Sequence, residues 1–248
     1  MRHIALFILL LVDYSIQAEE RITFKAKDGV TITADVHMAH PSTAPFIILF
    51  HQAGWSRGEY LEIAPTLNRI GFNCMAVDLR SGNLVNGVRN ETNQDAKRTM
   101  KETKYTDAEK DILASVKVAK ESYAKGKLIL WGSSYSAALA MRYTGEHIDE
   151  VDGVLAFSPG EYFKSMGKPA DYITQSASKI SCPVFITSAQ NEKNSWWNMY
   201  EVIPSEDKTY YLPTETSGNH GSKALFTKFT DHQEYWEAVI VFLEIFKN

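Results

Sequence analysis

The stretch Lys127-Leu-Ile-Leu-Trp-Gly-Ser-Ser-Tyr-Ser-Ala-Ala-Leu-Ala140 decides how this chain folds. A short apolar run ends at Gly132, and a helix pattern rich in small residues starts at about Ser136. A chain that turns so sharply from strand to helix needs small residues two positions before and two positions after the apex. Gly132 and Ser136 meet that need, so Ser134 at the apex is predicted to hold its hydroxyl clear of the sheet, as a nucleophile does.

Two neighbouring hydroxyls compete with this serine. An apex residue needs small residues two positions before and after it, and a strand that ends where the turn begins. Neither Ser133 nor Ser136 meets both conditions. The other alternative is an ordinary Gly/Ser-rich turn between a strand and a helix, without chemistry. The pattern favours Ser134 as a working nucleophile because it stands between a strand and a helix.

Strand and helix patterns alternate along the rest of the chain. The segments at 21–27 and 31–37 alternate apolar and polar residues around Asp28-Gly29, which is typical of a β-hairpin. Further strands are expected at 46–50, 73–79, 127–131, 151–157, 182–187 and 209–212, and helices at 59–70, 106–124, after the turn at Ser134, around 196–200 and at 232–246. Residues 83–105 lack clear periodicity and are expected to form a surface loop or a lid margin.

This order of elements predicts an α/β fold. We expect one domain over residues 19–248, with a mostly parallel eight-stranded sheet, helices on both faces and no large cap domain. The net charge of −4 provides no basic footprint, which argues against a nucleic-acid partner. The oligomeric state does not follow from the sequence.

The first 18 residues are typical of a signal peptide. A basic start is followed by nine apolar residues from Ile4 to Val12, and the segment ends at Ala18. The apolar run is too short to span a bilayer. We expect cleavage after Ala18 and export to a periplasm or outside the cell; a buried N-terminal strand or helix is the alternative. In that setting Cys74 and Cys182 are expected to be two unpaired core thiols, and a disulfide between them is the alternative.

A serine hydroxyl needs a base to take its proton, and histidine is the usual choice. Of the seven histidines, His220 is the best candidate, because Gly218 and Gly221 hold it in a loop without an apolar pattern. It also follows the serine in chain order, as this architecture requires. His37 and His40 have no further ligand cluster near them, so no metal site is expected.

A carboxylate must orient that histidine and stabilise its charged form. Glu192 follows the strand at 182–187 at about the right distance, with Asn191 where aspartate would be more usual. Glu161, after the preceding strand, is the alternative acid. The two amide donors for an oxyanion are expected from Tyr135, directly after the nucleophile, and from the loop after the strand at 46–50.

In that loop, His51-Gln-Ala-Gly54, Ala53 is the expected donor and Gln52 the alternative, whereas His51 is expected to brace the loop. A plain strand–helix connection is the alternative for this loop. Aromatic residues at or near the carboxyl ends of strands could line an apolar substrate pocket, although each could equally belong to the core: Trp55, Tyr135, Trp196, Trp197 and Phe163.

Four motifs carry a resemblance to a known family. They are Ile-Leu-Phe-His-Gln-Ala-Gly, Val-Asp-Leu-Arg-Ser-Gly, Gly-Ser-Ser-Tyr-Ser and Gly-Asn-His-Gly. The chain resembles the α/β-hydrolase superfamily, and within it the compact, dienelactone-hydrolase-like members. The resemblance implies a serine hydrolase without a cofactor, with Ser134, Glu192 and His220 at the matching positions. Ser136 departs from the usual glycine. The dienelactone enzymes proper use a cysteine nucleophile, so their substrate is not carried over.

We therefore expect hydrolysis of small-molecule carboxylic esters through an acyl-serine intermediate. An amide or peptide hydrolase with the same three residues is one alternative. A non-catalytic binding protein on a hydrolase scaffold is the other.

Overall fold

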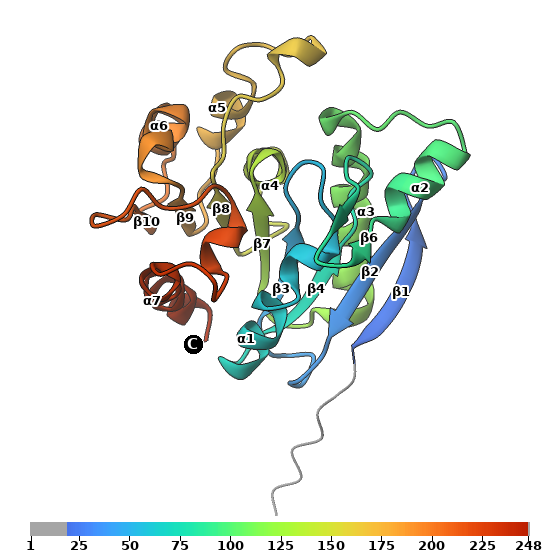
Figure 1. Cartoon of the computed structure of the whole chain (residues 1–248), viewed down its shortest axis with the longest axis horizontal. Helices are drawn as coiled ribbons and strands as arrows, with labels where there is room; N and C mark the ends of the chain where they lie inside the picture. The colour runs from blue at the N-terminus through green and yellow to red at the C-terminus, as the bar shows by residue number, and fades with distance from the viewer. Residues whose placement is uncertain (1–18, 248) are drawn as a thin grey trace, which may run out of the picture.

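An eight-stranded sheet runs through the middle of the molecule, in the order β1-β2-β4-β3-β7-β8-β9-β10 (Figure 1). The computed structural model describes residues 19–247, so the predicted signal peptide at 1–18 lies outside the described residues. The strands of this sheet are β1 (Glu20–Lys25), β2 (Thr31–His37), β3 (Phe46–Phe50), β4 (Asn73–Val77), β7 (Leu128–Ser133), β8 (Gly153–Phe157), β9 (Val184–Thr187) and β10 (Lys208–Tyr211).

Strand β2 runs antiparallel to both of its neighbours, β1 and β4. The remaining neighbours pair in parallel, as β3 does with β4 and with β7. The α/β-hydrolase fold predicted from the sequence is therefore confirmed. Because the parallel strands share one direction, the loops that follow β3, β7, β8 and β9 meet at the same edge of the sheet.

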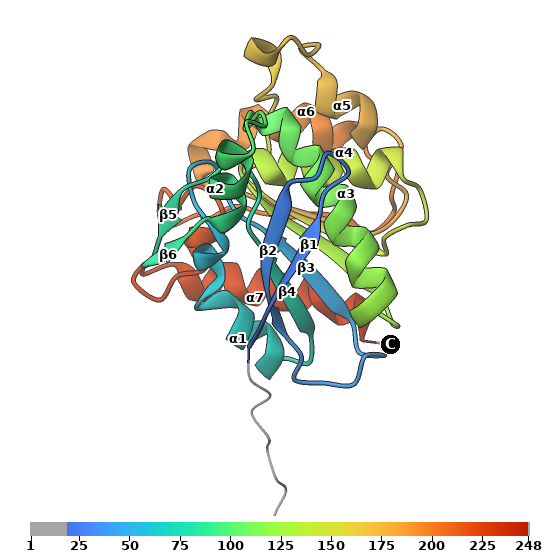
Figure 2. The same cartoon turned by 90° about the vertical axis from the view of Figure 1, so that its right-hand side faces the viewer.

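Helices cover both faces of the sheet (Figure 2). Helices α1 (Ile63–Arg69) and α7 (His232–Leu243) lie on one face, and α3 (Glu109–Val118) and α4 (Tyr135–Glu146) lie on the other. Two further helices, α5 (Tyr172–Ala177) and α6 (Lys193–Val202), pack beyond α4.

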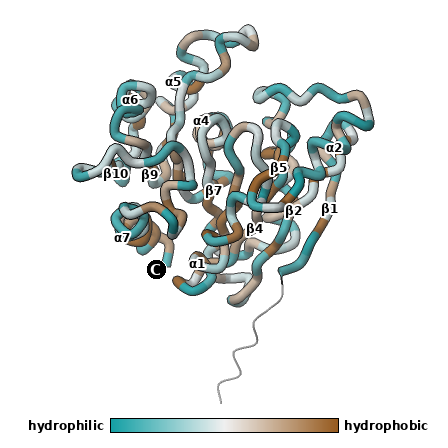
Figure 3. Tube along the Cα trace, in the orientation of Figure 1, coloured by the Kyte–Doolittle hydropathy of each residue, from teal (hydrophilic) through white to brown (hydrophobic). Residues whose placement is uncertain are grey.

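The core accordingly has two layers, one on each face of the sheet. All five residues of β3 are fully buried; Phe46, Ile48 and Phe50 face the α3/α4 layer, and Ile47 and Leu49 face the α1/α7 layer. A strand buried on both faces is expected to be a continuous apolar run, as β3 is. In Figure 3 hydrophobic colour gathers on the central strands, and the outer helices α2 and α6 are mainly hydrophilic.

The stretch at 83–105, predicted to be an irregular loop, is mostly structured. Strands β5 (Leu84–Val85) and β6 (Val88–Arg89) form a hairpin around Asn86-Gly87, where both residues have positive φ. Helix α2 (Glu91–Arg98) follows, and the side chain of Asn90 accepts a hydrogen bond from the amide of Asn93 at its start. The prediction failed because local turn and cap chemistry, rather than apolar periodicity, specifies this segment.

Two other predicted helices have different limits. The helix predicted at 59–70 is divided into a 3-10 turn, Arg57–Tyr60, and α1. The helix predicted at 106–124 begins with a 3-10 turn, Tyr105–Ala108, and ends in one π-helical turn, Ala119–Tyr123.

Cys74 and Cys182 are both free thiols, as expected. Within residues 19–247 no helix is both long enough and apolar enough to cross a bilayer.

Two buried arginines tie separate segments to the sheet. Arg80, which is fully buried, contacts Asp111 on α3 at 2.7 Å and Asp28 in the first hairpin at 2.6 Å. Arg57 is likewise surrounded by three carboxylates, those of Asp35, Asp78 and Glu91. These ion pairs fix the hairpin, the loop after β4 and the start of α2 in place.

Candidate active site

The turn between β7 and α4 has the geometry of a nucleophile elbow. Ser134 lies at its apex with φ of 60° and ψ of −123°, a strained backbone for a residue other than glycine. Its amide donates a hydrogen bond of 2.7 Å to the carbonyl of Phe157 on β8. A Cβ at Gly132 would lie 2.4 Å from the backbone of Ala137, so the turn requires glycine there.

Ser136, which stands where glycine is usual, takes part in the turn. Its hydroxyl donates to the carbonyl of Phe50 at 2.7 Å and accepts from the amide of Ser133 at 2.9 Å. The departure from the common motif is therefore accommodated by hydrogen bonds that a glycine could not make. The side chain also links the elbow to the end of β3.

His220 and Glu192 are in direct contact. Nδ1 of His220 and Oε1 of Glu192 are 2.6 Å apart, although 28 residues separate them in the chain. The histidine loop turns sharply, with φ of +71° at Gly218 and +73° at Gly221. A Cβ at Gly218 would lie 2.3 Å from the Tyr235 hydroxyl, so this position also needs glycine. With Nδ1 engaged by the carboxylate, Nε2 is the nitrogen left for proton transfer.

A second serine holds the acid and the histidine loop together. The Ser158 hydroxyl donates to Oε2 of Glu192 at 2.7 Å and accepts from the amide of Gly221 at 2.8 Å. Ser158 directly follows β8 and has a φ of 54°. Burial would raise the pKa of Glu192, but hydrogen bonds from His220, Ser158 and the amide of Ala189 outweigh burial and hold this pKa below its ordinary value.

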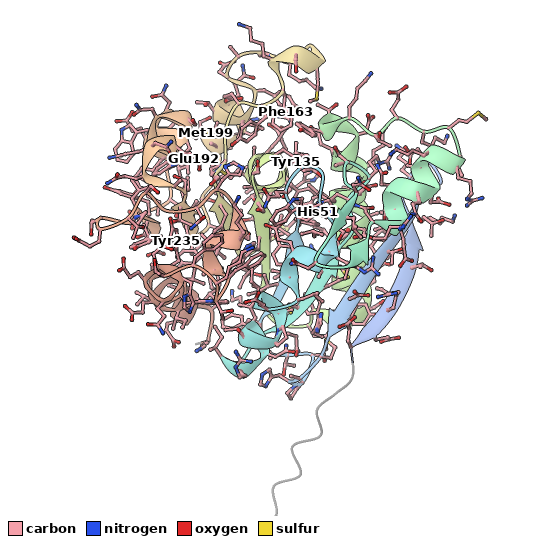
Figure 4. All side chains as sticks on the ribbon, viewed as in Figure 1. His51, Tyr135, Phe163, Glu192, Met199 and Tyr235 are labelled. Carbon is pink, nitrogen blue, oxygen red and sulfur yellow. The ribbon has the colours of Figure 1, made fainter. Side chains whose placement is uncertain are left out.

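The histidine loop also contacts the elbow. The amide of Ser222, two residues after His220, donates to the hydroxyl of Ser133 at 2.9 Å. The backbone just after the histidine is therefore fixed beside the residue that precedes the nucleophile. Within residues 19–247 the structure contains no hydrogen bond between the side chains of Ser134 and His220. Figure 4 labels Glu192, Tyr135 and His51, which come from separate loops at the carboxyl edge of the sheet.

Glu161, the alternative acid, is engaged elsewhere. Its carboxylate accepts hydrogen bonds from the amides of Ile173 and Thr174, at 2.9–3.1 Å, at the start of α5. In the described part of the chain it makes no hydrogen bond to His220. Glu161 therefore serves as a helix N-cap, and Glu192 is the carboxylate next to the imidazole.

The two candidate amides of the loop after β3 differ in what they bind. The amide of Gln52 donates to Oε2 of the buried Glu59 at 2.7 Å, so it is already engaged. The amide of Ala53 has no acceptor among residues 19–247, and neither does the amide of Tyr135 at the first position of α4. These two free amides, one in the loop after β3 and one in the elbow, can hold an oxyanion.

His51 braces this loop, as expected. It is fully buried; its Nδ1 lies 2.8 Å from the carbonyl of Gln52, and its Nε2 accepts from the amide of Leu79 at 2.9 Å. Burial lowers its pKa to about 4, so it is neutral at physiological pH.

The predicted pocket aromatics have different surroundings. Phe163 and Trp196 have no exposed surface and belong to the core; Trp196 donates to the Ser188 hydroxyl at 2.8 Å. Trp55 and Trp197 are half-buried, and the buried ring of Tyr135 stacks on Tyr105 with centroids 4.6 Å apart. Three of the five aromatic residues, Tyr135, Phe163 and Trp196, are therefore core, because a position near the end of a strand does not by itself determine burial.

Tyr162, which the sequence reasoning missed, lies next to the nucleophile. Its hydroxyl donates to the carbonyl of Ser158 at 2.7 Å. Burial raises its pKa to about 12, the charge of Glu192 adds to this effect, and the neighbouring Ser134 hydroxyl opposes it. The ring comes from the short segment after β8.

No group of three or more metal-ligating side chains occurs within residues 19–247.

Comparisons with known proteins agree with this geometry. The model of the Hydrolase_4 family, described as "Serine aminopeptidase, S33", matches residues 41–169, or about half of the chain. An esterase of Pyrococcus furiosus is 18% identical, with a TM-score of 0.69 and 93% of both chains covered. A dienelactone hydrolase of Anabaena variabilis is 12% identical, with a TM-score of 0.70 over 93% of this chain and 99% of that chain.

A thermostable carboxyl esterase of Bacillus coagulans is 13% identical, with a TM-score of 0.67 over 94% of this chain and all of that chain. At such identities these similarities establish the fold alone. The comparison with curated proteins gives no match.

Proposed function

The chain belongs to the Hydrolase_4 family of α/β hydrolases, and from that premise we propose that it cleaves small carboxylic esters through an acyl-serine intermediate. The observation that carries the proposal is the 2.6 Å contact between His220 and Glu192, in a loop bonded to the elbow of Ser134. Nucleophile, base and acid follow one another in the order Ser–acid–His expected for this fold.

The proposed reaction has two halves. Oγ of Ser134 attacks the ester carbonyl while Nε2 of His220 takes the hydroxyl proton, and Glu192 stabilises the imidazolium that forms. The negative oxygen of the tetrahedral intermediate accepts hydrogen bonds from the amides of Ala53 and Tyr135. His220 then passes its proton to the leaving alcohol. In the second half a water molecule attacks the acyl-serine while His220 takes its proton. His220 then returns a proton to Ser134 as the carboxylic acid is released.

Hydrolysis of p-nitrophenyl acetate tests this proposal. We expect release of p-nitrophenolate by the wild-type protein and its loss in Ser134→Ala. Ser195→Ala is the matched control, because Ser195 is exposed on α6 and should leave the rate unchanged. Equal rates for the wild type and Ser134→Ala would refute the proposal. A panel of p-nitrophenyl esters with longer acyl chains would then measure the size of the site.

The description of the matching family favours a second candidate, an amide or peptide hydrolase with the same residues. Aminoacyl p-nitroanilides and p-nitrophenyl esters of the same acyl group distinguish the two. We expect a higher kcat/KM for the ester. A higher kcat/KM for the anilide would favour the peptidase, and no turnover of either would favour a binding protein.

We also propose that the protein is exported after removal of residues 1–18. N-terminal sequencing of the protein purified from its native cells should begin at Glu19. A mature protein that begins at Met1 would contradict export by this route.

A further inference from the structure

Glu59 is a buried carboxylate that the proposed reaction does not use. It lies in the turn before α1 and has no exposed surface. Its two oxygens accept three hydrogen bonds, from the amide of Gln52 at 2.7 Å, from the Gln52 side chain at 3.3 Å and from the Ser133 hydroxyl at 2.7 Å. A buried carboxylate is costly unless its oxygens are satisfied. Here neutral donors satisfy the two carboxylate oxygens, and no cationic side chain within residues 19–247 forms an ion pair with them.

These bonds connect three parts of the proposed active site. Gln52 directly precedes Ala53, whose amide is free for the oxyanion. Ser133 directly precedes the nucleophile, and its hydroxyl also accepts from the amide of Ser222 in the histidine loop at 2.9 Å. A Cβ at Gly221 would lie 2.6 Å from the Ser133 hydroxyl, so the histidine loop is packed tightly on this bridge.

The donors around Glu59 favour its ionised form. A protonated carboxyl would need an acceptor, whereas the groups that face its oxygens donate. Burial raises the pKa of Glu59 to about 7, although hydrogen bonds from Gln52 and Ser133 and the charge of His220 act in the opposite direction.

We propose that Glu59 is a positioning residue of the active site. Its carboxylate holds the oxyanion loop, the elbow and the histidine loop in one arrangement. The inference rests on the proposed function, because it assigns Glu59 a part in the same reaction.

Glu59→Gln tests this role. The amide keeps the size of the side chain but loses the charge and one acceptor. We expect kcat for p-nitrophenyl acetate to fall about 10- to 100-fold, since positioned oxyanion donors each contribute about 100-fold or more. KM should stay within about twofold, because Glu59 does not touch the substrate.

Ser133→Ala tests one arm of the bridge. It breaks the link from Glu59 to the histidine loop but leaves Glu59 bonded to Gln52, so kcat should fall while KM stays within about twofold. Glu161→Gln is the matched control, because that carboxylate also accepts backbone amides but lies at the start of α5. It should leave kcat and KM unchanged. If Glu59→Gln does not fold, Glu59→Asp keeps a carboxylate on a shorter side chain and should likewise lower kcat with KM unchanged.

A Glu59→Gln protein with wild-type kcat would overturn the inference. A lower melting temperature with unchanged turnover per folded molecule would overturn it too, since Glu59 would then be purely structural. An inactive wild type would refute the proposed function, whereas an active wild type with equal turnover in Glu59→Gln would refute this inference.

Discussion

Asp111 and Glu59 are both carboxylates without exposed surface, but their surroundings differ. Asp111 lies against the guanidinium of Arg80, and the same arginine also binds Asp28. Glu59 is held by the neutral donors of Gln52 and Ser133. The first carboxylate belongs to an ion-pair network, which also includes Lys110 at 3.5 Å from Asp28, that joins a hairpin to a helix. The second joins three segments of the proposed active site and forms no ion pair within residues 19–247.

The difference separates two uses of a buried carboxylate. Around Arg80 the buried carboxylate is paired with a guanidinium, so the network contributes to the position of the segments it joins. Around Glu59 hydrogen bonds from neutral donors join the segments that carry Ala53, Ser134 and His220. We therefore expect changes around Arg80 to alter stability and changes around His220 to alter turnover.

The largest expected effect is on kcat. His220→Ala should lower kcat for p-nitrophenyl acetate by at least about a thousandfold, because no other group takes the serine proton. The melting temperature should change little, because the side chain of His220 is a third exposed. Steady-state kinetics and thermal denaturation measure the two quantities. A mild loss of kcat would mean that another group is the base.

Arg80→Met should have the next largest effect, on stability. Removing the guanidinium leaves the fully buried Asp111 without its ion-pair partner, which should lower the free energy of unfolding by about 3–5 kcal/mol. Urea denaturation measures this change. Arg98→Met is the control: Arg98 makes an exposed ion pair with Asp95, worth about 1 kcal/mol or less. Equal losses in the two variants would contradict the role of the Arg80 network.

Glu192→Gln should lower kcat by on the order of a hundredfold, the range of a general acid–base contribution. The amide no longer stabilises the imidazolium, although the shape of the site is preserved. Glu161→Gln, which changes the alternative acid, should leave kcat unchanged. If the two variants exchanged these outcomes, Glu161 would be the acid of the reaction.

The smallest effect concerns the pH dependence of stability. The hydrogen bond from Arg80 holds the pKa of Asp28 below its ordinary value. Its ionised form therefore stabilises the fold at pH values above that ordinary value, about 4, and this contribution is lost as the pH falls further. Asp28→Asn should unfold more readily than the wild type at pH 7, and the difference should shrink below about pH 4. A difference that stays constant would contradict the pairing.

Sequence patterns predicted the parts of the fold that depend on local steric rules. The elbow follows from Gly132 and small neighbours, and the mostly parallel sheet follows from the alternation of strand and helix patterns. The turn residues Asn86-Gly87 and the cap residue Asn90 also indicate a hairpin and a helix start, but apolar periodicity does not detect them. The catalytic roles of Ser134 and His220 stay predictions.

Other features depend on contacts that a sequence does not display. Glu59 stands in the polar stretch Ser-Arg-Gly-Glu, which gives no indication of complete burial. Phe163 and Trp196 belong to the core although both follow strands: Phe163 packs against Tyr172 of α5, and Trp196, on α6, packs against Tyr210 of β10. The hydrogen bond that removes the Gln52 amide from the oxyanion candidates likewise depends on the tertiary position of Glu59.

Covalent labelling tests the central claim most directly. The protein is incubated with a fluorophosphonate, which phosphonylates an activated serine, and the modified peptide is identified by mass spectrometry. We predict one adduct, on the hydroxyl of Ser134, formed by the wild type and by Ser195→Ala but not by Ser134→Ala. A wild-type protein that stays unlabelled, or an adduct on a different serine, would contradict the account.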